Sequence, residues 1–181
     1  MRKSDLGHSV AARRAIADAV ASGAVQDIGR GWLATADAAP AVVAARQLGA
    51  TVSCISAAPF YGLAHISLPE QPHVAVPRNR GRRSVESGAR VHREPLWTPP
   101  DEGPVAPAAE VAARALRCLP AAEAIVLVGC ALNKGLVTVA ELEGRLRGRG
   151  GPAAREALAR TQRRSRSPTE TLARLALEDA D

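Results

Sequence analysis

The histidines and cysteines are the side chains best suited to catalysis or metal binding, so their spacing comes first. Three cysteines, Cys54, Cys118 and Cys130, stand far apart among apolar neighbours, and no two form a Cys-x-x-Cys pair. This pattern indicates buried free thiols in a reducing compartment. The histidines show no pair at helical ligand spacing and have no Cys or Asp nearby in the chain to complete a zinc site. We therefore expect no metal and no cofactor, and surface or strand positions for all four: His8, His65, His73 and His92.

Acidic residues offer no clearer sign of an active site. A metal-dependent nuclease needs carboxylates that converge on one point, whereas the clustered acids here lie at the C-terminus and are typical of a solvated helix end. The glycine-rich stretch 148–151 also lacks the Lys-Ser/Thr ending of a phosphate-binding loop. We expect no catalytic residues and no enzymatic activity. The C-terminal acids are Glu170, Glu178, Asp179 and Asp181.

Basic residues are more informative than acidic ones. The chain has 24 Lys and Arg against 18 Asp and Glu, for a net charge of +6, and all but two of the cations are Arg. The planar guanidinium suits phosphates and guanine edges, although a GC-rich genome would also favour Arg. Only four residues are aromatic, which excludes a broad platform for stacking bases.

The arginines gather in two segments. The first is a loop between two predicted strands, and it is expected to contact DNA phosphates through Arg78, Arg80, Arg82 and Arg83. The second runs from Arg145 to Arg166 across a glycine-rich stretch. For this second segment a solvated face or a flexible joint explains the charge as well as binding does.

A helix followed by a small basic hairpin is predicted near the N-terminus. The helix spans Ser9–Ser22 with Ser9 as its cap, and two short strands in residues 24–34 flank a Gly-Arg-Gly turn. This order is typical of the second half of a winged helix, in which the helix enters the major groove. An ordinary amphipathic helix is the plainer alternative. The predicted DNA contacts are Ser9, Arg13 and Arg14 on the helix and Arg30 on the wing.

The remaining elements fix the fold class as α+β. The chain is predicted to hold a partial winged-helix element, then a small mixed α+β domain, then a helical C-terminal half. In residue numbers these are a DNA-binding element at 1–36, an α+β domain at 37–147 and a basic helical tail at 148–181. The expected helices are Pro40–Leu48, Glu110–Leu119, Pro120–Asn133, Thr138–Leu146, Pro152–Arg164 and Pro168–Glu178. Paired strands are expected at 73–76 and 89–92, a mixed segment at 53–63 and a Pro-rich linker at 95–107.

Several of these segments resemble, in order, the actinobacterial proteins related to AbiEi, the antitoxin and autorepressor of a type IV toxin–antitoxin system. The matching phrases are Arg13-Arg14-Ala15-Ile16, Gly29-Arg30-Gly31-Trp32, Ser53-Cys54-Ile55-Ser56, His73-Val74-Ala75-Val76-Pro77-Arg78, Val91-His92-Arg93, and the run from Cys130 to Thr138 with Glu141-Leu142. Many relatives continue into a restriction-endonuclease-like domain whose first helix begins with a Ser-Pro-x-Glu phrase. The phrase Ser167-Pro168-Thr169-Glu170 is similar to it, so 148–181 resembles the start of such a domain, without its catalytic part.

The resemblance implies a sequence-specific, double-stranded DNA-binding transcriptional regulator, a repressor of antitoxin type. Two alternatives stay open: a protein-interaction module that docks a partner such as a cognate toxin through its Ala-rich helices, and an inactive nuclease remnant. Binding to a palindromic operator would require a homodimer. The longest apolar runs fall short of the roughly 20 residues that cross a bilayer, and the N-terminus lacks an apolar signal stretch. The sequence therefore predicts a cytoplasmic protein without membrane contact.

Overall fold

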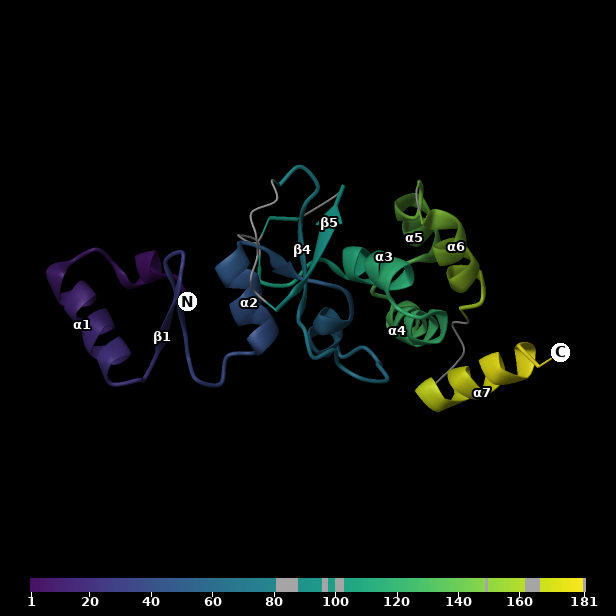
Figure 1. Ribbon diagram of the computed structural model, residues 1–181, viewed down its shortest axis with the longest axis horizontal. Helices are drawn as coiled ribbons and strands as arrows, with labels where there is room; N and C mark the ends of the chain where they lie inside the picture. Colours follow the sequence, from purple (N-terminus) through teal and green to yellow (C-terminus); the bar gives the residue numbers. More distant parts are fainter. Residues whose placement is uncertain (81–87, 96–97, 100–102, 149, 162–166, 181) are drawn as a thin grey trace.

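The computed structural model describes residues 1–80, 88–95, 98–99, 103–148, 150–161 and 167–180. Its elements form an elongated row, with a helix and hairpin at one end, a small sheet in the middle and a group of helices at the other end (Figure 1). The α+β class is confirmed. Within the described residues, no helix is both long and apolar enough to cross a membrane.

The N-terminal end contains the predicted helix and hairpin. A 3-10 turn, η1 (Lys3–Leu6), leads into α1 (Val10–Ala21), where Ser9 Oγ accepts the Ala12 N–H at 3.1 Å as the expected cap. Strands β1 (Gln26–Gly29) and β2 (Trp32–Ala34) pair antiparallel. All three turn residues 29–31 have positive φ, a conformation that favours glycine at the two outer positions. The order helix, strand, turn, strand is therefore as predicted.

The middle of the molecule is a helix over a three-stranded sheet. Helix α2 (Pro40–Leu48) has the predicted bounds, with Pro40 in its first turn and Gly49 left-handed at its end. The sheet order is β3 (Thr51–Val52), β4 (His73–Pro77), β5 (Arg90–Glu94). Strand β4 runs antiparallel to β3 and parallel to β5. The sequence predicted β4 and β5 as partners but missed β3, because a two-residue strand has too little pattern to detect.

Two connecting segments differ from expectation. The mixed segment 53–63 holds a 3-10 helix, η2 (Cys54–Tyr61). The end of the predicted Pro-rich linker packs against β3: the Val52 N–H donates to the Pro104 carbonyl at 2.7 Å, and the Ala106 N–H donates to the Val52 carbonyl at 2.8 Å. Residues 104–106 therefore belong to the sheet region rather than to a free linker.

In the described residues after 107, the chain forms five helices: α3 (Ala108–Cys118), α4 (Ala121–Asn133), α5 (Val139–Arg145), α6 (Gly151–Ala159) and α7 (Pro168–Glu178). Thr138 and Ser167 cap α5 and α7 by accepting the N–H groups of Glu141 and Glu170. The predicted helix to Arg164 ends earlier, at Ala159, and residues 162–166 lie outside the described part. Gly151 is required at the start of α6, since a Cβ there would lie 2.2 Å from the Leu146 carbonyl oxygen.

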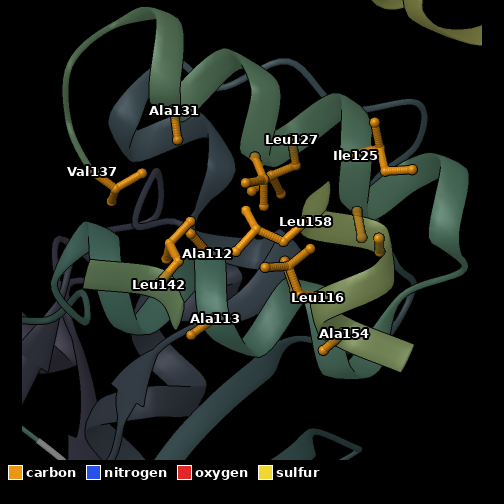
Figure 2. Packing of buried hydrophobic residues seen from close by; sticks show 14 of the residues in the cluster. Ala112, Ala113, Leu116, Ile125, Leu127, Ala131, Val137, Leu142, Ala154 and Leu158 are labelled. Carbon is orange, nitrogen blue, oxygen red and sulfur yellow. The ribbon is translucent and has the colours of Figure 1, made fainter. Parts of the chain in front are cut away.

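Small and large apolar side chains interlock in the core of this helical half (Figure 2). Leu116, Leu127, Leu142 and Leu158 are buried among alanines such as Ala112, which is fully buried. Alanine lets helix axes approach closely, so a chain with few large hydrophobic residues still fills its interior. A second, smaller apolar cluster lies between α2 and the sheet.

Candidate functional site

The predicted DNA contacts on α1 are all exposed, but two of them are engaged locally. Ser9 caps the helix, as described above. The guanidinium of Arg13 turns back to the helix start, where Nη2 donates to the His8 carbonyl at 3.1 Å. Arg14 is exposed, and α1 as a whole has no buried residue. Ala12, Ile16 and Ala19 form its half-buried stripe.

Arg30 of the hairpin turn and Arg80 of the Arg-rich loop come together at the end of α2. Arg80 Nη1 donates to the Gly49 carbonyl at 2.8 Å. A Cβ placed on Gly49 would lie 3.3 Å from Arg30 Nη1 and 3.6 Å from Arg80 Nη2, so both guanidinium groups flank the same glycine. The structure thus joins two of the predicted contact residues from segments far apart in the sequence.

Two further arginines extend this cationic region across Trp32. The guanidinium carbon of Arg46 lies 3.8 Å from the Trp32 ring centroid, and that of Arg2 lies 4.9 Å from it. Burial lowers the pKa of Arg46, and the neighbouring charge of Arg2 lowers it further. We use the term basic surface for Arg2, Arg30, Arg46 and Arg80. Neither Arg2 nor Arg46 was predicted as a contact, because each lies outside the Arg-rich runs.

Of the other predicted loop arginines, Arg78 is the one that the structure describes. Arg78 is exposed at the end of β4, where its N–H donates to the Glu94 carbonyl at 2.9 Å. Arg82 and Arg83 lie outside the described residues.

Several members of the second Arg-rich segment are used within the chain. Arg160 Nη2 lies 2.6 Å from Asp179 Oδ1 and 3.3 Å from Glu178 Oε2. Arg155 Nη1 donates to the Leu146 carbonyl at 2.9 Å. For these two arginines an intramolecular role therefore explains the charge. Two of the four C-terminal acids, Glu178 and Asp179, pair with Arg160 and remain exposed at the end of α7.

A second site was not predicted. Cys54, His73, His92 and Cys118 each direct a ligand atom into one cluster, and these four atoms all lie within 4.8 Å of one another. The expectation that the cysteines and histidines stay apart is wrong for these four residues. Cys54, His73 and His92 are buried, and Cys118 is half-buried.

The parallel pairing of β4 and β5 brings the two imidazoles together. His92 is opposite Ala75 in the register, and Ala75 is two residues from His73, so both histidines project from the same face of the sheet. Their ring centroids are 5.1 Å apart, and His92 Nε2 lies 3.3 Å from His73 Nδ1. An antiparallel or shifted register would separate them.

The two cysteines approach this face from the connecting elements. Cys54 begins η2, separated from the end of β3 by one residue, and has φ of 53°, a left-handed conformation that is uncommon for a non-glycine residue. Cys118 ends α3, and its Sγ lies 3.9 Å from His73 Nδ1 and 3.9 Å from His92 Nε2. Ser56 Oγ accepts the backbone N–H of His73 at 2.9 Å and so fixes η2 to β4.

The surroundings shift the pKa values of the two thiols in opposite directions. Hydrogen bonding with Cys54 is the largest cause that lowers the pKa of Cys118, and the ring nitrogens of His73 and His92 lower it further. The same hydrogen bond between the two thiols raises the pKa of Cys54, and burial raises it further. The cluster therefore favours a thiolate at Cys118.

The remaining histidines and cysteine lie elsewhere. Cys130 Sγ is 4.0 Å from the Gly62 carbonyl, and His65 Nδ1 is 3.0 Å from the Leu63 carbonyl. His8 is exposed before α1. Cys118 and Cys130 are half-buried rather than buried as expected. One signal could have revealed the cluster: His73 and His92 both fall in strands predicted to pair.

No family model, curated protein or solved structure matches this chain.

Proposed function

We propose that this chain is a sequence-specific double-stranded DNA-binding regulator of the cytoplasm, a repressor of the AbiEi antitoxin type. The observation that carries the proposal is the meeting of Arg30 and Arg80 at Gly49. One comes from the wing of the helix–hairpin element and the other from the Arg-rich loop. Guanidinium groups held side by side form a strong site for phosphates, and each neutralised phosphate releases counterions.

The basic surface and α1 have separate roles in this proposal. Arginines at the hairpin tip and at the end of α2 contact phosphates and fix the orientation of the duplex, whereas α1 reads base edges with its exposed side. Arg13 and Arg14 are the predicted base or phosphate contacts on α1, and both are exposed, although Arg13 also donates to the His8 carbonyl. A dimer would place two such units on a palindromic operator.

The alternative of a partner-docking module receives less support from the helices that suggested it. The alanines of α3 and α4 are largely buried in the chain's own core. A cognate toxin, if one exists, would have to bind another surface.

Binding to the chain's own upstream DNA tests the proposal. A labelled upstream duplex and a scrambled duplex of equal composition are titrated with protein at low and at physiological salt. We expect preference for the upstream duplex that persists at the higher salt, because base contacts survive when phosphate attraction is screened. Equal affinity for both duplexes at both salts would contradict sequence-specific regulation.

A further inference from the structure

We propose that Cys54, His73, His92 and Cys118 bind one zinc ion in a closed tetrahedral site that ties the three-stranded sheet to η2 and α3. This inference is independent of the proposed function, since it concerns a buried site whose residues are separate from the basic surface.

The distances in the cluster agree with ligands around a common ion. Zinc lies about 2.0–2.1 Å from a histidine nitrogen and about 2.3 Å from a cysteine sulfur, so tetrahedral ligands are about 3.3–3.8 Å apart. The two ring nitrogens are 3.3 Å apart. Cys118 Sγ is 3.9 Å from each of them. A shift of a few tenths of an ångström would bring these atoms to ideal positions.

The chemistry of the donor set favours zinc. Soft thiolates and imidazoles select zinc and related ions, whereas magnesium, calcium and manganese prefer oxygen. Two thiolates and two neutral imidazoles also balance the charge of a divalent ion, so the loaded site is neutral. A neutral site suits the low exposure of Cys54, His73 and His92, because burying an unbalanced charge is costly.

Four protein ligands indicate a structural role. Catalytic zinc sites usually keep one position for water or substrate, whereas structural sites close all four with protein side chains. Each ligand here comes from a different element, namely η2, β4, β5 and α3. An ion would therefore cross-link these elements where the sheet meets the helical half. Arg114 of α3 and Glu94 of β5 form an ion pair across the same boundary.

A disulfide between Cys54 and Cys118 is the competing explanation for their proximity. It would account for two residues of the cluster but not for two imidazole nitrogens directed at the same point. Ser56 also holds the backbone of His73 in place, which links η2 to β4 beside the cluster.

The test measures zinc binding by the full-length reduced protein without DNA, so its failure is distinct from failure of the regulatory proposal. Zinc affinity is determined by competition with a chromophoric chelator. The wild type should bind one zinc per chain. Removing a residue that hydrogen-bonds to a metal ligand weakens metal affinity by about 10- to 100-fold. Cys118→Ser or His92→Asn removes a ligand itself and should weaken zinc affinity by more than that.

Matched controls replace the same residue types outside the cluster. Cys130→Ser and His65→Asn should bind zinc as the wild type does. Unchanged zinc affinity in Cys118→Ser would overturn the site.

Cobalt binding by the wild type gives a readout that does not depend on whether the variants fold. Co²⁺ should show the intense visible bands of a tetrahedral ion together with thiolate-to-cobalt charge transfer. A weak octahedral spectrum without charge transfer, or a Cys54–Cys118 disulfide that forms equally fast with and without zinc, would overturn the proposal.

Discussion

Removing the two arginines at Gly49 should reduce the salt dependence of DNA binding by a predictable amount. Each neutralised phosphate contributes about 0.9 to the slope of log affinity against log salt. If Arg30 and Arg80 each contact one phosphate, the double variant should have a slope smaller by about 1.8. Between 50 and 200 mM salt the wild type should then lose about 12-fold more affinity than the variant does.

The substitutions are chosen to keep the local structure. Arg30 has φ of 52°, and asparagine tolerates this conformation better than alanine does, so the first change is Arg30→Asn. Arg80 donates to the Gly49 carbonyl, and glutamine retains a side-chain donor, so the second change is Arg80→Gln. The control is Arg160→Gln, because Arg160 already pairs with Glu178 and Asp179.

Fluorescence anisotropy with a labelled duplex at four salt concentrations measures the slopes, and circular dichroism checks the fold. We expect a smaller slope for the double variant and the wild-type slope for the control. A folded double variant with the wild-type slope would refute the assignment of Arg30 and Arg80 to phosphate contact.

Three further changes test the fold and the cluster. Leu127→Ala should lower the free energy of unfolding by about 2–5 kcal/mol in a urea titration, because Leu127 is fully buried in the helical core; a loss under 1 kcal/mol, on the order of a surface substitution, would contradict that packing. Burial raises the pKa of Glu110, so the folded protein favours the protonated side chain. The stability gained from this protonation is lost as the pH rises through the folded-state pKa. Glu110→Gln should therefore stabilise the protein more at pH 7 than at pH 4, and an equal effect at both would be inconsistent with the shift. Ser56→Ala removes the acceptor of the His73 backbone N–H, which links η2 to β4 beside the cluster, and should weaken zinc affinity, with unchanged affinity as the opposing result.

Elements with local signals could be predicted from the sequence. Helix α2 has Pro40 at its start and Gly49 after its end, and α7 has Ser167 as its cap, so their bounds depend on neighbouring residues only. The short strand β3 could not be predicted, because it exists only through its pairing with β4.

The cluster was missed for a related reason. Its four ligands lie on four elements, and a search for close spacing along the chain cannot find them. His73 and His92 share a face only because β4 and β5 run parallel in one particular register. The sequence indicated two paired strands but contained no local signal for their relative direction. Likewise, the meeting of Arg30 and Arg80 depends on how the hairpin docks beside α2.

The convergence of four side chains on a single zinc ion is the central claim, and X-ray absorption at the zinc K edge of the purified protein tests it most directly. We predict a first coordination shell of two sulfurs at about 2.3 Å and two imidazole nitrogens at about 2.0–2.1 Å. A shell of oxygen donors, or one with fewer than two sulfurs, would contradict the claim.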